Sequence, residues 1–159
     1  MSNNRINKSR VIFGLLTIAV MVFIFIFSCE NADKSSDTSG TIVGLIINIF
    51  YKKIIDMTLA EQTEILDLIS HIIRKTAHFV IYAALGFFVF LTSGHKRMFC
   101  RETLWVLLFC GLYAVSDEIH QYFVPGRACM IRDMLLDTCG SITGITASFL
   151  LVKLFHRKK

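Results

Sequence analysis

Four long apolar stretches divide the chain, and shorter polar segments separate them. The first stretch, "VIFGLLTIAVMVFIFIFS" at 11–28, carries no charge and is long enough to cross the ~30 Å hydrocarbon core of a bilayer as a helix. Further apolar stretches cover residues 76–92, 103–122 and 134–154. The pattern predicts an all-α, polytopic membrane protein with four transmembrane helices.

The basic residues of the connecting segments predict how these helices are oriented. They concentrate in the N-terminal arm, the 94–102 segment and the C-terminal tail, as Arg5, Lys8, Arg10, Lys96, Arg97, Arg101, Lys153, Arg157, Lys158 and Lys159. With four spans these segments share one side, which the positive-inside tendency makes the cytoplasm. Both termini are then cytoplasmic, and segments 29–73 and 123–133 are extracytoplasmic.

The segment after the first span has helical patterns of its own. "NADKSSDTSG" is polar and turn-prone, and "TIVGLIINIFYKKII" has apolar residues at helical spacing, which suits an interfacial helix or one packed on the bundle. "LAEQTEILDLISHIIRK" predicts a second amphipathic helix, and Thr58, three residues before Glu61, fits a capping box. The apolar face of this helix contains Ile65, Leu68, Ile69 and Ile72. We therefore expect an extracytoplasmic segment that carries amphipathic helices.

The composition supports one membrane domain and excludes several other classes. Hydrophobic residues make up 54% of the chain and charged residues 18%, against about 25% charged in a typical soluble domain. We predict a cytoplasmic N-terminus at 1–10, a single membrane domain at 11–155 and a basic cytoplasmic tail at 156–159. The five cysteines include no CxxC pair, which argues against a zinc ribbon, and their odd number argues against a full disulfide framework. The basic 94–102 segment is better explained by topology than by nucleic-acid binding.

Charged and polar residues gather where three of the predicted spans meet the outer side. "IRKTAHF" enters the second span there, "SDEIHQ" ends the third, and "GRACMIRDMLLD" enters the fourth. A bare charge in lipid is costly, so such residues usually face a bundle interior or a water-filled cavity. We therefore predict a shared, outward-facing polar pocket.

Helical spacing assigns these residues to faces. One face of the second span contains Lys75, His78, Tyr82 and Gly86. One face of the third contains Gly111, Ala114, Glu118 and Gln121, and a neighbouring face contains Asp117 and His120. A stripe on the fourth contains Asp133, Asp137, Gly140, Gly144 and Ser148, whose small members suit helix packing or oligomer contacts.

Three of these stretches carry a family resemblance. "RKTAHFVIYAALGF", "YAVSDEIHQYFVPGR" and "RDMLLDTCGSITG", in this order, resemble the VanZ-like family of small bacterial membrane proteins. The resemblance implies a multi-pass protein of the bacterial cytoplasmic membrane. It also implies a link to low-level resistance to the glycopeptide teicoplanin, which is associated with the founding member.

The resemblance also implies a set of site residues. By motif match these are Arg74, Lys75, His78, Tyr82, Asp117, Glu118, His120, Gln121, Arg127, Asp133 and Asp137. Two positions depart from the family pattern: Ile81 stands where many relatives carry an acid, and Cys29 stands where the family often has Ser.

The chemistry of these residues leaves alternatives open. His78 and His120 are candidate metal ligands or proton carriers, but without HExxH spacing we favour hydrogen bonds to acids on neighbouring helices and predict neither metal nor cofactor. Asp117, Glu118 and Asp137 can act as an acid–base pair. The nearby basic residues favour ion pairs with Arg74, Lys75 or Arg127 instead.

The basic residues themselves suggest a ligand. Arg74, Lys75, Arg127 and Arg132 lie on the side where membrane anchoring is usually less basic, so we expect them to bind a phosphate or carboxylate group. "VPGR" predicts a tight turn, in which Pro125 fixes φ and Gly126 permits a positive φ. That turn would hold Arg127 over the mouth of the pocket.

Three functions follow from these observations. The preferred one is a membrane protein that binds an anionic lipid or a cell-wall precursor in its outward-facing pocket, alters the cell envelope and contributes to glycopeptide resistance. Its binding residues would be Arg74, Lys75, His78, Tyr82, Asp117, Glu118, Gln121, Arg127, Asp133 and Asp137. The first alternative is a membrane enzyme acting on an envelope lipid, with catalytic residues among His78, Asp117, Glu118 and His120. The second is a small proton-linked transporter or scramblase, which would need oligomerisation.

Overall fold

The described part of the chain consists of four helices in one bundle. The structure is a computed structural model, and it describes residues 3–29, 58–95 and 97–157. The helices are α1 (Asn3–Ser28), α3 (Leu59–Ser93), α4 (Arg101–Tyr122) and α5 (Ile131–Arg157). These described residues contain no strand, which agrees with the all-α prediction. The interfacial helix expected within 30–57 lies outside the described residues.

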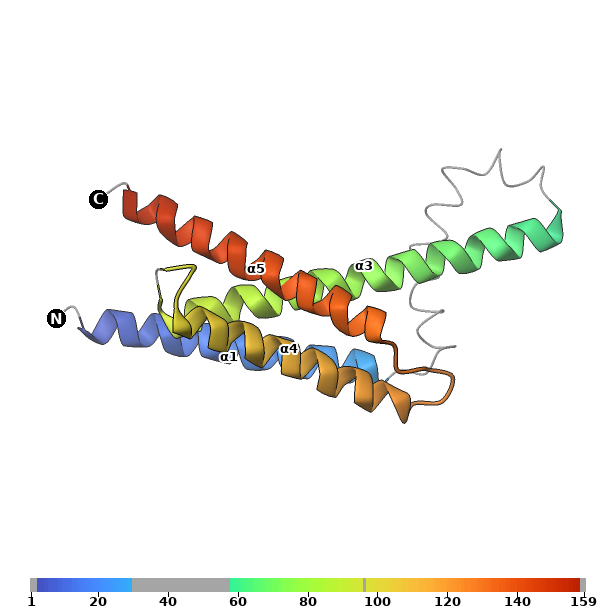
Figure 1. Cartoon of the computed structure of the whole chain (residues 1–159), viewed down its shortest axis with the longest axis horizontal. Coiled ribbons are helices and arrows are strands. Elements are labelled where there is room, and N and C mark those ends of the chain that lie inside the picture. The colour runs from blue at the N-terminus through green and yellow to red at the C-terminus, as the bar shows by residue number, and fades with distance from the viewer. Residues whose placement is uncertain (1–2, 30–57, 96, 158–159) are drawn as a thin grey trace.

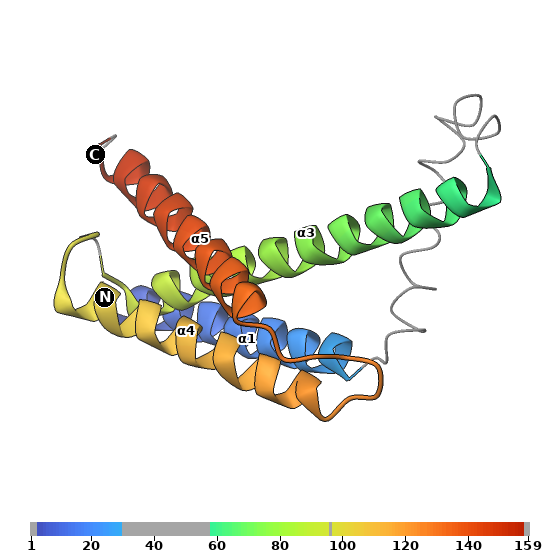
Figure 2. The same cartoon turned by 45° about the vertical axis from the view of Figure 1, so that its right-hand side comes forward.

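Helices α1 and α4 lie side by side, and α5 crosses over α3 (Figure 1). The start of α1, the end of α5 and the connection from α3 to α4 lie at one end of the bundle (Figures 1 and 2). The most extensive packing is between α3 and α5, followed by that between α1 and α3. The three basic segments noted in the sequence therefore belong to the same end of the molecule.

Among the described residues, three helices are long and apolar enough to cross a membrane, instead of the four that we expected. Their apolar parts are Lys8–Ser28, Leu59–Ser93 and Ile131–Phe155. The predicted span at 103–122 does form a helix, α4, but its uncharged part extends only from Thr103 to Ser116. At 1.5 Å per residue this part is about 21 Å long, shorter than the ~30 Å hydrocarbon core. Acidic residues at both ends of α4 thus account for the difference.

The predicted amphipathic helix and the second span form a single helix. α3 has 35 residues and continues through "HIIRKTAHF" without a break. Its start is the predicted capping box, in which the Thr58 backbone N–H donates to Glu61 Oε2 at 2.8 Å. Its end is Gly94, whose φ of 70° lies in the left-handed region that favours glycine. The N-terminal part of α3 extends beyond the other described helices (Figure 2), and Leu68 and Ile72 are exposed.

The distribution of side chains is that of a membrane bundle. Large apolar side chains cover the outside, among them Ile18 and Phe25 of α1 and Leu112 of α4. Several polar residues are fully or almost fully buried, namely Ser28, Asp117, Glu118, Gln121, Asp137, Ser141 and Ser148. Exposed apolar surface of this extent suits a lipid environment, whereas buried polar groups require partners inside the bundle.

Specific contacts hold the helices in register. Ile24, Tyr82, Leu85, Cys110 and Ala114 form a core cluster shared by α1, α3 and α4. The Tyr113 hydroxyl donates to the Met21 carbonyl at 2.7 Å and links α4 to α1. At the basic end, the Arg10 guanidinium donates to the carbonyls of Thr92 and Ser93, which the end of α3 leaves without helical partners.

The small residues of α5 serve internal packing. A Cβ at Gly140 would collide with the backbone of Phe79, and one at Gly144 with the backbone of Ala83. The reciprocal contact is made by Gly86 of α3, where a Cβ would meet the backbone of Ser141. Of the two roles expected for this stripe, the structure shows helix packing, and it brings the backbones of α3 and α5 into direct contact.

Candidate functional site

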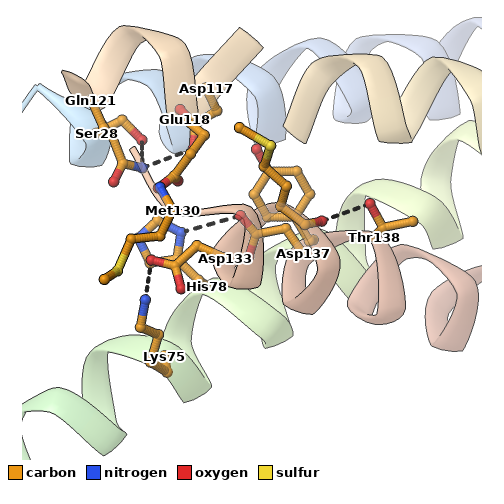
Figure 3. Close-up of polar contacts among 12 residues, drawn as sticks. Ser28, Lys75, His78, Asp117, Glu118, Gln121, Met130, Asp133, Asp137 and Thr138 are labelled. Atoms are coloured by element: carbon orange, nitrogen blue, oxygen red, sulfur yellow. Dashed lines mark hydrogen bonds and ion pairs between the residues drawn. The ribbon is translucent and has the colours of Figure 1, made fainter. Parts of the chain in front are cut away.

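The polar residues singled out in the sequence converge where the end of α4 and the start of α5 meet the middle of α3. Figure 3 shows the side chains that α3, α4 and α5 contribute to this cluster, with Ser28 of α1 at its edge. The residues brought together are Lys75, His78, Asp117, Glu118, Gln121, Asp133 and Asp137, and we call them the polar cluster. The faces predicted from helical spacing explain this convergence. Tyr82 shares one face of α3 with Lys75 and His78, and Asp137 shares one face of α5 with Asp133. Tyr82 and Asp137 are both buried, so these faces point into the bundle.

Gln121 is the hub of the α4 side of the polar cluster. Its Nε2 donates to Asp117 Oδ2 at 3.1 Å and to Ser28 Oγ at 3.2 Å, and its Oε1 accepts from Arg127 Nη1 at 3.0 Å. A side-chain amide can donate and accept at the same time, so Gln121 connects Arg127 to the carboxylate of Asp117. Asp117 and Gln121 are both about 95% buried.

Glu118 holds the loop between α4 and α5. Its Oε1 accepts from the Met130 backbone N–H at 2.7 Å, although the side chain is only 1% exposed. Before this contact the chain turns at 124–127, where the Arg127 N–H donates to the Val124 carbonyl at 3.1 Å. Gly126 has a φ of 78°, as predicted for the third residue of a type II turn. The turn and the Glu118 contact together place Arg127 beside the polar cluster.

Two ion pairs join α3 to α5. Lys75 Nζ pairs with Asp133 Oδ2, and His78 Nδ1 lies 3.8 Å from Asp137 Oδ2. The second distance is too long for a hydrogen bond. We expected the acids at 117, 118 and 137 to pair with Arg74, Lys75 or Arg127. Their contacts described above are with Gln121, the Met130 backbone and His78, and Lys75 pairs instead with Asp133.

A pocket of about 140 Å³ opens beside the polar cluster. It is lined by Arg74, Gln121, Gly126, Arg127, Ala128, Met130 and Asp133. At ~30 Å³ per water molecule, this volume suits a phosphate or carboxylate group. Two arginines and one aspartate line it, so its walls carry hydrogen-bond donors for an anion as well as one acidic side chain.

Some predicted residues lie elsewhere. His120 points to α1, where its ring stacks on Phe25 with centroids 4.7 Å apart and its Nε2 lies 3.3 Å from Cys29 Sγ. This agrees with the assignment of Glu118 and His120 to different faces of the helix. Arg132 is exposed and does not line the pocket. Arg74 lines the pocket and also contacts His71 Nδ1 at 3.4 Å.

Two partners in the site were not identified from the sequence. Ser28, which is fully buried at the end of α1, accepts a hydrogen bond from Gln121. Met130 takes part through its backbone N–H, for which no sequence signal exists. Ser28 is the polar residue at the end of the apolar run 11–28, and that position alone gave no reason to place it against α4.

Within the polar cluster, His78, Asp117 and Asp137 have the arrangement of a possible metal-ligand set. One ligand atom from each lies within 4.8 Å of the others. The three residues come from α3, α4 and α5, so the grouping depends on helix packing and has no spacing motif.

Comparison with known proteins gives one match. The sequence model of the VanZ/LLP1 family matches residues 13–155, which is nearly the whole chain. No curated protein and no solved structure matches it.

Proposed function

This chain belongs to the VanZ/LLP1 family, and from that premise we propose that it is a protein of the bacterial cytoplasmic membrane that binds an anionic lipid or a cell-wall precursor. The binding would take place in the pocket beside the polar cluster and would alter the cell envelope. The family is generally linked to glycopeptide resistance, and low-level resistance to teicoplanin-type drugs is the expected cellular effect.

The pocket with its two arginines is the observation that carries this proposal. Arg74 and Arg127 line the same 140 Å³ space from α3 and from the 123–130 loop. Planar guanidinium groups bind phosphate and carboxylate through paired hydrogen bonds, which a lysine cannot reproduce. The Gln121 carbonyl, which accepts from Arg127, fixes one of these guanidinium groups in place before a ligand arrives.

The charge distribution supports an outward orientation for this pocket. The basic segments gather at the other end of the bundle, around the start of α1 and the 94–100 connection. The positive-inside tendency assigns that end to the cytoplasm. The pocket would then face the outer leaflet, where both envelope lipids and glycopeptides are found.

Glycopeptide susceptibility of cells that express variants tests this function. Wild type should raise the inhibitory concentration of teicoplanin, whereas Arg74→Ala and Arg127→Ala should lower this protection at equal membrane abundance. Loss of one charge-assisted hydrogen bond costs about 1.5–3 kcal/mol, or ~10–100-fold in affinity. Arg132→Ala is the matched control, because Arg132 is exposed and outside the pocket. Equal protection by all four proteins would contradict the proposal.

An enzyme is the second candidate, and the burial of Asp117 and Asp137 beside His78 favours it over transport. Mutation separates the three functions. A binder loses activity in graded steps through Arg74, Lys75 and Arg127. An enzyme fails abruptly when His78 or Asp117 alone is replaced while the protein still inserts. A transporter depends on the proton gradient, so an uncoupler should abolish its effect.

A further inference from the structure

Three polar side chains of the polar cluster face one another, and one of them has a buried oxygen without a hydrogen-bond partner among the described residues. They are His78 of α3, Asp117 of α4 and Asp137 of α5, and their ligand atoms all lie within 4.8 Å of one another. Figure 3 shows that they reach the same space from three separate helices. Neither a local sequence motif nor the geometry of one helix brings these three side chains together.

The charges in this group are not balanced by the contacts that surround them. Asp117 is 4% exposed and Asp137 is 1% exposed, so water screens neither carboxylate. Asp137 Oδ1 is buried and has no hydrogen-bond partner among the described residues. The imidazole of His78 pairs with Asp137 only at a distance of 3.8 Å between Nδ1 and Oδ2. Two buried carboxylates at this separation repel each other unless a positive charge or a proton lies between them.

The other acids of the polar cluster already have partners. Glu118 accepts from the Met130 backbone, and Asp133 pairs with Lys75. The carboxylate oxygen left without a partner, Asp137 Oδ1, therefore belongs to the group formed by His78, Asp117 and Asp137. The buried Tyr82 hydroxyl faces the carboxylates of Asp117 and Asp137.

We propose that His78, Asp117 and Asp137 bind one divalent transition-metal ion of the Zn²⁺ or Mn²⁺ type. One imidazole and two carboxylates form a mixed nitrogen and oxygen set that suits these ions, whereas Mg²⁺ and Ca²⁺ prefer oxygen alone. Ligand atoms around an ion at ~2.1 Å lie about 3.4 Å apart in tetrahedral geometry, so the group needs to contract by roughly 1 Å. Small side-chain rotations would achieve this.

The surroundings of the three residues are those of a supported metal site. The Gln121 amide, itself hydrogen-bonded to Ser28, orients Asp117 through its Oδ2. Such outer contacts commonly fix the ligands of metal sites. None of the three ligands lines the arginine pocket, so the two sites have separate ligand sets, and Gln121 contacts both.

Metal binding by the full-length protein tests this inference. The protein would be purified in nanodiscs without a histidine tag, stripped with a chelator, and titrated with ZnCl₂ in a calorimeter. Wild type should bind about one equivalent, and Asp137→Asn and Asp117→Asn should each weaken binding at least ~tenfold. The matched controls are His95→Gln and Glu102→Gln, which remove one imidazole and one carboxylate at the opposite end of the bundle. They should bind as wild type does.

A spectroscopic measurement keeps the test decisive if an aspartate variant fails to fold. Wild type loaded with Mn²⁺ should show the nitrogen coupling of a histidine ligand in pulsed electron paramagnetic resonance, and His78→Gln should lose it. The inference is overturned if wild type binds no ion, if the controls lose binding as well, or if His78→Gln keeps the coupling. Absence of binding would leave a proton shared by Asp117 and Asp137 as the explanation of the cluster.

Discussion

At the scale of single residues, the chain places charged groups where a membrane bundle can accommodate them. Asp117 and Glu118 are adjacent in sequence and both are buried, yet they face different partners. Asp117 contacts Gln121 within its own helix, and Glu118 contacts the backbone of the following loop. Adjacent residues on a helix differ by about 100° in direction, so one pair of acids serves two tasks.

Glu118 provides a prediction at this scale. Glu118→Gln keeps a carbonyl oxygen for the Met130 N–H and removes the buried charge, so the protein should keep its stability and its loop. Glu118→Ala removes the acceptor and should lower the free energy of unfolding by about 1 kcal/mol. Thermal unfolding in detergent, followed by circular dichroism, measures both.

The two Glu118 variants also test the role of this residue. If glycopeptide protection survives in Glu118→Gln but falls in Glu118→Ala, Glu118 positions the loop. If both variants lose protection completely while their stabilities match that of wild type, Glu118 takes part in the chemistry, and the positioning role is contradicted.

At the scale of elements, the crossing of α3 and α5 determines where the site forms. The small residues Gly140 and Gly144 let the two backbones touch. This contact brings Asp137, one turn before Gly140, next to His78 of α3. The stripe that looked like a packing surface in the sequence therefore also sets the distance between two site residues.

A substitution at this crossing should separate the helices. A Cβ at Gly144 meets the backbone of Ala83, which cannot move as a flexible side chain can. Gly144→Val should therefore lower stability by ~1–3 kcal/mol and should also loosen the contact between His78 and Asp137. Unfolding of the purified protein and its metal affinity are the two measurements.

Gly111 of α4 is the control for this substitution. A Cβ there meets nothing within 4 Å. Gly111→Ala should be tolerated and should even stabilise the helix by up to ~1 kcal/mol, because glycine is a poor helix former. Equal effects at Gly111 and Gly144 would show that helix propensity, and not the crossing, decides the outcome.

At the scale of the whole molecule, one end of the bundle is basic and the other carries the polar cluster. This polarity predicts which cysteines are accessible from outside the cell. In single-cysteine variants that retain Cys29 or Cys129, both exposed and near the cluster, a membrane-impermeant maleimide should label intact cells. Cys100, in the connection at the basic end, should react only after the cells are opened.

One outcome of the cysteine labelling would contradict this orientation. Labelling of Cys100 but not of Cys129 in intact cells would invert the orientation and place the pocket in the cytoplasm. In that case the pocket would meet precursors on the inner leaflet, and binding of an extracellular target would no longer explain resistance. Cys110 is fully buried and serves as the unreactive reference.

Much of the architecture was predictable from the chain itself. Apolar runs predicted the helices α1 and α5, Thr58 with Glu61 predicted the start of α3, and Pro125 with Gly126 predicted the turn before Arg127. These features depend on neighbours within a few residues, so the local sequence contains the cause. Two expectations failed, because the boundary at 73–76 and the third predicted span, at 103–122, were judged from hydropathy alone. A helix continues through polar residues when its backbone hydrogen bonds are intact, as in α3. The charged residues at the two ends of α4 are too close together to leave an uncharged stretch that crosses the hydrocarbon core.

The sequence by itself determined which residues carry charge and on which face of a helix each one lies, since a period of 3.6 residues fixes direction. Only the tertiary structure decided their partners. It joined Lys75 to Asp133, turned His120 toward α1, and grouped His78 with Asp117 and Asp137. The physical reason is that contacts between helices depend on the depth and angle of their crossing. The glycines of α3 and α5 set that crossing through backbone contact between residues far apart in the chain.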